Sequence, residues 1–77
     1  MTKQERIKKD NIYNECRRYS RSISKCIAYA DAQRETCAML SFNGCNSEEN
    51  AFLEWCYHKA IDRLYDKLDA QLEKRNK

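Results

Sequence analysis

Apolar positions in the first half of the chain repeat with a helical period. Between residues 10 and 40 they recur in alternating steps of four and three, the spacing of one face of an α-helix. The positions between them are mostly charged, as an amphipathic helix requires. The pattern therefore predicts one helix over residues 10–40, capped by Asp10 or Asn11. Its apolar face consists of Ile12, Cys16, Tyr19, Ile23, Cys26, Ala30, Cys37 and Leu40, with Gln33 as a polar member.

The only strong break in this pattern is the segment 41–46, which contains Asn43 and Gly44. Glycine supplies the positive φ that a chain reversal needs. A second amphipathic pattern begins near Ser47, and we expect a helix at about 47–75. A short turn between two long helices predicts an antiparallel helical hairpin. The second apolar line runs through Phe52, Cys56, Ala60, Leu64, Leu68 and Leu72.

Composition agrees with an all-α fold. The chain has 77 residues with one Gly and no Pro, so it lacks the residues that make most β-turns. A chain of this length forms one small domain, which we place at residues 10–77. Residues 1–9 precede the first predicted helix. We expect them to be either a frayed extension of that helix or a flexible basic N-terminal arm containing Lys3, Arg6, Lys8 and Lys9.

Charge is unevenly distributed along the chain. Residues 1–25 hold eight bases and three acids, although the whole chain carries only +3. Such a segment could contact nucleic-acid phosphates, but it shows no recognised motif and no stacking platform. We therefore favour a solvated helix face over a nucleic-acid partner. With no apolar run long enough to span a bilayer and no apolar signal region, we expect a protein that is at most peripheral to a membrane.

Five cysteines in a small chain favour disulfides that compensate for a thin core. Because facing residues of an antiparallel helix pair follow one register, candidate bridges can be tested against each other. Cys26–Cys56 with Cys37–Cys45 satisfies one register, and Cys16–Cys56 with Cys26–Cys45 satisfies another. We favour the first pairing, since the second would turn the well-patterned segment before Gly44 into a long loop. The expected fold is thus an antiparallel hairpin stapled by two disulfides, with an extended C-terminal helix.

Other chemistry has little support in the sequence. A single histidine, His58, has no partners in a cleft that would make it catalytic, so we expect no enzyme and no cofactor. Zinc could use cysteines together with His58, but Cys56 and His58 are two residues apart and point away from each other on a helix. We expect no metal site.

The two cysteine pairs around the turn resemble those of the coiled-coil-helix-coiled-coil-helix (CHCH), or twin Cx9C, proteins. Cys26 and Cys37 are separated by ten residues, as are Cys45 and Cys56, whereas Cys16 and Cys26 have the nine-residue spacing of the family. The resemblance implies location in the mitochondrial intermembrane space without a cleavable presequence. It also implies an import oxidoreductase that recognises the region of Cys56 or Cys16. The family's copper chaperones carry an adjacent cysteine pair that this chain lacks.

The function implied by the resemblance is that of a non-catalytic accessory subunit or assembly factor of a respiratory-chain complex, such as NADH dehydrogenase or cytochrome oxidase. The second helix extends past the cysteines with an apolar line that we expect to bind the partner: Ile61, Leu64, Tyr65, Leu68 and Leu72. The alternative is a small cytosolic or phage-type hairpin that keeps its cysteines reduced and binds a protein or nucleic acid.

Overall fold

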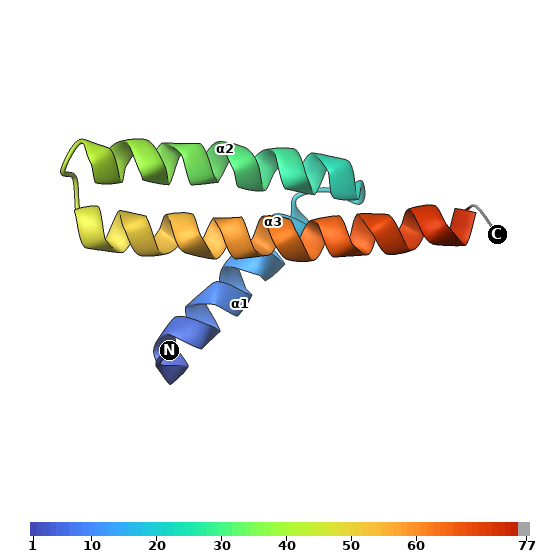
Figure 1. Ribbon diagram of the computed structural model, residues 1–77, viewed down its shortest axis with the longest axis horizontal. Coiled ribbons are helices and arrows are strands. Elements are labelled where there is room, and N and C mark those ends of the chain that lie inside the picture. The colour runs from blue at the N-terminus through green and yellow to red at the C-terminus, as the bar shows by residue number, and fades with distance from the viewer. Residues whose placement is uncertain (76–77) are drawn as a thin grey trace.

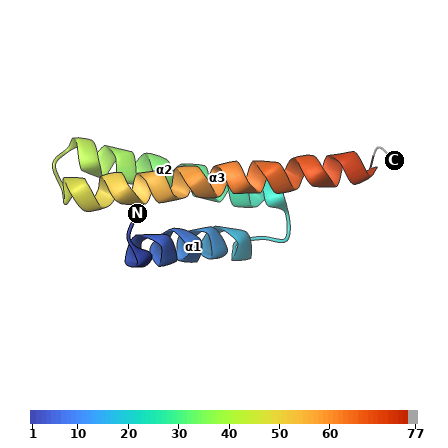
Figure 2. The same cartoon turned by 60° about the horizontal axis from the view of Figure 1, so that its bottom comes forward.

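The computed structural model describes residues 1–75, and this part of the chain is helical without strands. Helix α1 covers Lys3–Arg18, α2 covers Ile23–Phe42 and α3 covers Ser47–Arg75. Helices α2 and α3 lie side by side as an antiparallel hairpin, and α1 packs mainly on α3 as a second layer (Figures 1 and 2). The all-α prediction is confirmed. Two of the three described helices, α2 and α3, form the hairpin.

The prediction of a single helix over residues 10–40 is wrong. The chain leaves the helix after Arg18 and re-enters it at Ile23, so that α1 folds back under the hairpin (Figure 2). The Ser20 hydroxyl accepts a hydrogen bond of 3.1 Å from the backbone N–H of Ser22 in this break, and Ser22 occupies the N-cap position of α2 without a side-chain cap hydrogen bond. Serine favours such caps and turns because its hydroxyl competes for backbone partners.

Residues 1–9, predicted as a frayed extension or a flexible basic arm, are helical from Lys3 onward. Helix α1 begins at Lys3 because Thr2 and Glu5 form a reciprocal capping box: the Glu5 N–H donates to the Thr2 hydroxyl, and the Thr2 N–H donates to the Glu5 carboxylate. The hydrogen bonds with Thr2 lower the pKa of Glu5. The cap therefore lies about eight residues before the Asp10 or Asn11 expected from the pattern.

The turn between α2 and α3 forms as predicted. Gly44 has a φ of +82°. Its N–H donates to the Ser41 carbonyl and the N–H of Cys45 donates to the Leu40 carbonyl, and these two hydrogen bonds close the end of α2. This is the Schellman arrangement, in which a residue in the left-handed region ends the helix. Ser41 and Ser47 then exchange hydrogen bonds of 3.1 Å between hydroxyl and carbonyl groups across the turn. They fix the register of the hairpin.

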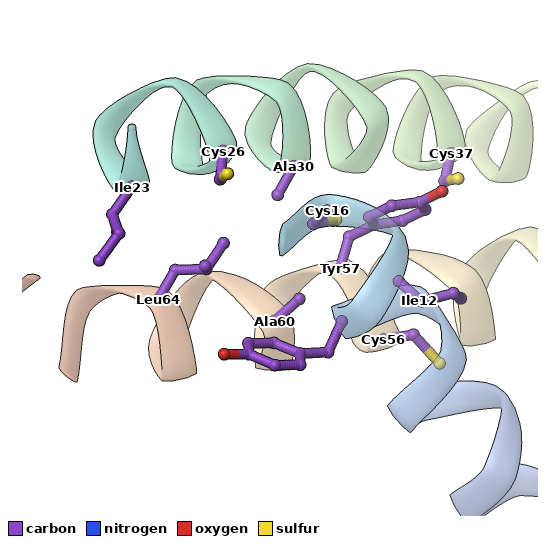
Figure 3. Close-up of a cluster of buried hydrophobic side chains, with 11 residues drawn as sticks. Ile12, Cys16, Ile23, Cys26, Ala30, Cys37, Cys56, Tyr57, Ala60 and Leu64 are labelled. Carbon is purple, nitrogen blue, oxygen red and sulfur yellow. The ribbon is translucent and has the colours of Figure 1, made fainter. Parts of the chain in front are cut away.

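One core lies where the three helices meet (Figure 3). Most of the first predicted apolar face is buried in it, but Tyr19 is 59% exposed and Leu40 38% exposed. From α3, the side chains of Cys56, Tyr57, Ala60 and Leu64 complete the core. Because α1 adds a second layer, the core is larger than the single seam of a two-helix hairpin. The remaining buried residues are Ile12, Tyr13, Cys16, Ile23, Cys26, Ala30 and Cys37.

Candidate functional site

Four of the five cysteines are core residues, and none forms a disulfide in this structure. Cys16, Cys26 and Cys56 are fully buried and Cys37 nearly so, whereas Cys45 is exposed beside the turn. All five are free thiols. The predicted pairings Cys26–Cys56 with Cys37–Cys45, and Cys16–Cys56 with Cys26–Cys45, are therefore not supported.

The register of the hairpin explains why Cys26 faces neither Cys56 nor Cys45. Ser41 faces Ser47, so each step back along α2 is matched by a step forward along α3. Cys26 consequently lies near Leu64 (Figure 3) and about 10 Å along the axis from the position facing Cys56, at 1.5 Å per residue. A disulfide requires Cα atoms within roughly 7 Å. The Cys26–Cys45 pairing is further away still, because most of α2 separates Cys26 from the turn.

Burial makes the core thiols poor nucleophiles. Desolvation raises the pKa of Cys16 to about 12, with smaller contributions from the charges of Glu15 and Cys26. Desolvation also raises the pKa of Cys37 and of Cys56. The Cys26 thiol donates to the Ser20 carbonyl at 3.2 Å, which ties α2 to the α1–α2 connection. A protonated, enclosed thiol neither attacks a substrate nor binds a metal readily.

Side chains that could bind a metal ion are not gathered in the described part of the chain. Within residues 1–75, no group of three or more His, Cys, Asp or Glu side chains could hold a metal ion. His58 is exposed and lies 3.9 Å from the Asp62 carboxylate on the same face of α3.

The predicted partner surface on α3 is only partly exposed. Leu64 is fully buried against α2, and Ile61 and Leu68 pack against the core. Assigning Leu64 to partner binding was therefore wrong, because α2 reaches further along α3 than the disulfide registers implied. Tyr65 and Leu72 remain accessible, with 50% and 47% of their surface exposed.

The residues of the predicted basic arm lie on α1. Lys3, Arg6 and Lys8 are exposed and Lys9 is half-buried. The Lys8 ammonium lies 3.9 Å from the Glu49 carboxylate at the start of α3. The arm is thus part of the folded unit rather than a separate ligand-binding tail.

The regions proposed for contact with an import oxidoreductase belong to the core. Cys56 has no exposed surface, and its neighbours Phe52, Leu53 and Trp55 pack against the core. Cys16 is equally enclosed. That partner stays a prediction, and it would have to act before the chain folds into this structure.

A polar network that the sequence did not reveal joins all three helices. One oxygen of the Glu15 carboxylate on α1 accepts hydrogen bonds from the hydroxyls of Tyr29 on α2, at 3.3 Å, and Tyr57 on α3, at 3.0 Å. Burial, together with this carboxylate, raises the pKa of both tyrosines. The three residues are far apart in sequence, so no spacing could have linked them.

A cation–π contact also holds α1 to α3. The Arg63 guanidinium lies 3.8 Å from the centre of the Tyr13 ring and 3.3 Å from the Asp10 carboxylate. The Tyr13 hydroxyl itself is buried and has no hydrogen-bond partner in the described part of the chain.

The most exposed large apolar side chain lies at the hairpin tip. Phe42 is 91% exposed and Met39, one turn earlier on α2, is 64% exposed. The sequence did carry a signal for both residues, because they are large and apolar but lie outside the predicted apolar face that runs from Ile12 to Leu40. We read that face as the core and gave no role to apolar residues beside it.

None of the helices formed by residues 1–75 has both the length and the apolar character needed to cross a membrane. Comparison with protein-family models, curated proteins and solved structures found no match for this chain.

Proposed function

We propose that this chain is a non-catalytic protein-binding module whose three-helix core presents the hairpin tip to a larger partner. The observation that carries the proposal is the 91% exposure of Phe42 at the end of α2. Leaving a phenylalanine side chain in water costs free energy that burial against a partner would recover, and aromatic side chains are frequent anchors of protein interfaces.

Two neighbours extend the apolar surface at the tip. Met39 lies three residues before Phe42 and so projects from the same side of α2, and Leu40 is 38% exposed beside it. Methionine adapts its shape to a partner because its side chain is unbranched and flexible. In this proposal the four buried cysteines serve as small apolar core residues, and all five remain reduced.

A second candidate is the disulfide-stapled CHCH subunit or assembly factor of a respiratory complex in the mitochondrial intermembrane space. It rests on the spacing of the cysteines. It would require α3 to slide along α2 by about two turns before Cys26 could face Cys56. Alkylation of the protein from its native source distinguishes the candidates when it is done in denaturant, because the core thiols are enclosed in the folded chain. Five modified thiols support the reduced module, and a single one supports two bridges.

Variants of the tip test the proposed interface. We expect the double variant Met39→Asp/Phe42→Asp to stay folded, because both side chains are exposed, but to lose the proteins that co-purify with the wild type from its native source. Leu72→Asp is the matched control, since it places the same charge on an exposed apolar residue of α3. Retention of every partner by the tip variant would refute the proposal. Loss by Leu72→Asp alone would instead favour the surface predicted from the sequence.

A further inference from the structure

Folding brings cations from two distant parts of the chain to one end of the molecule. This basic end consists of Arg17 and Arg21, around the α1–α2 connection, and Lys67, Lys74 and Arg75, on the last turns of α3. Arg17, Lys67 and Lys74 line a depression of about 240 Å³. Arg21 and Arg75 line an adjoining one of about 360 Å³. The two depressions share Ile23 and Gln71, so they form one continuous surface.

Bases outnumber acids in the segments that hold these five cations. Residues 16–30 hold four bases and no acid, and residues 67–75 hold three bases and two acids. None of the five cations forms an ion pair with another residue in the range 1–75. Arg17 is held by hydrogen bonding to the Ser20 carbonyl at 3.2 Å, which fixes its position and leaves its charge available.

The opposite charge lies elsewhere on the molecule. Residues 31–66, which include the hairpin tip, hold seven acids and three bases. The protein is therefore strongly dipolar although its net charge is only +3. Such a distribution orients a polyanion toward the basic end during an encounter.

An aromatic platform lies at Tyr19, between Arg17 and Arg21 along the chain. The rings of Tyr19 and Tyr29 are stacked with centroids 4.5 Å apart and planes 15° from parallel. Tyr29 covers one face of Tyr19, yet Tyr19 is still 59% exposed. Lys25 lines the depression that contains both rings, which measures about 450 Å³. The hydroxyl of Tyr29 is anchored to Glu15, so the platform has a defined orientation.

We propose that the basic end binds single-stranded nucleic acid, with phosphates at the five cations and a base stacked on the outer face of Tyr19. Proteins that bind single strands without sequence preference combine a positive surface with aromatic rings on which bases stack. A duplex would leave Tyr19 unused because its bases are already stacked. The exposed Phe42, which could enter a lipid layer, is the last residue of α2 and so lies at the opposite end of the hairpin from Ile23.

Fluorescence anisotropy with labelled oligouridylate and oligothymidylate of about 16 nucleotides tests the proposal. We expect the wild-type protein to bind, and binding to weaken between about 50 and about 200 mM salt as counterion release requires. The double variant Arg21→Glu/Lys74→Glu should weaken binding at least tenfold. Lys3→Glu/Arg6→Glu changes the net charge equally at the exposed start of α1 and should weaken binding much less.

The stacking contribution has its own pair of variants. Tyr19→Ala should weaken binding roughly 5- to 100-fold, the range of one base–aromatic stack, and Tyr19→Phe should restore it. Tyr65→Ala removes a similarly exposed tyrosine from α3 and should have little effect. Circular dichroism establishes that each variant keeps its helices.

Three results would overturn the proposal. The first is absence of binding by the wild type at about 50 mM salt. The second is equal loss in the two charge-reversal variants, which would mean attraction by net charge alone. The third is binding to vesicles containing phosphatidylserine without binding to the oligonucleotides, which would assign the basic end to a membrane surface. None of these results affects the proposed protein interface at the tip.

Discussion

Truncation of Leu64 tests whether this residue belongs to the core or to a partner surface. Its side chain has no exposed area and lies between α2 and α3, close to Cys26 and Ile23 (Figure 3). Removing three buried carbon atoms from such a site costs about 2–5 kcal/mol, because the lost burial is accompanied by a cavity. A domain of this size has a total stability of about 4–12 kcal/mol. We therefore expect Leu64→Ala to remove a large part of the free energy of unfolding.

The assay is urea denaturation followed by far-ultraviolet circular dichroism. Leu72→Ala is the matched control, since it makes the same change two turns further along α3 at a residue that is 47% exposed, and it should stay within about 0.5 kcal/mol of the wild type. Leu64→Met conserves volume and should cost less than about 1.5 kcal/mol. Equal denaturation midpoints for Leu64→Ala and Leu72→Ala would refute the packing described here. They would also return Leu64 to the surface predicted from the sequence.

Two further predictions concern hydroxyl groups and thiols. The same substitution should have opposite effects at two tyrosines: Tyr57→Phe loses a 3.0 Å hydrogen bond to a carboxylate and should destabilise the protein by about 1–2 kcal/mol, whereas Tyr13→Phe removes a buried hydroxyl without a partner and should be neutral or stabilising. Urea midpoints that fall equally in both variants would contradict this. For pH, a Cys16 thiol whose pKa is raised to about 12 from an ordinary value of 9.0 stays protonated in the folded state after it has ionised in the unfolded state. The contribution of this thiol to the free energy of unfolding should thus be fully present below about pH 9 and be lost as the pH rises toward 12. The free energy of unfolding should therefore fall less steeply with pH in Cys16→Ala than in the wild type, and identical slopes would rule out a contribution from this thiol.

The sequence pattern predicted the features of this fold that depend on residues close together along the chain. The apolar period placed Ile12, Cys16, Ile23, Cys26, Ala30 and Cys37 inside, and all six are buried. The Asn43-Gly44 signal located the turn, because only a residue that tolerates positive φ ends the helix there. The same pattern missed the break at residues 19–22, since the apolar positions keep their phase across it. The clustered Ser20 and Ser22 were the available sign.

Only the tertiary structure decided which residues lie together. The return of α1 beneath the hairpin turned a single seam into a three-helix core, so the stability attributed to disulfides can come from packing. The hairpin register buried Leu64 and separated Cys26 from Cys56. Together with the return of α1, it placed Lys74 beside Arg17 and Arg75 beside Arg21, although more than fifty positions separate the members of each pair along the chain. Helical period and capping depend on neighbours within a few residues, whereas these contacts depend on how whole helices pack, which no short-range pattern records.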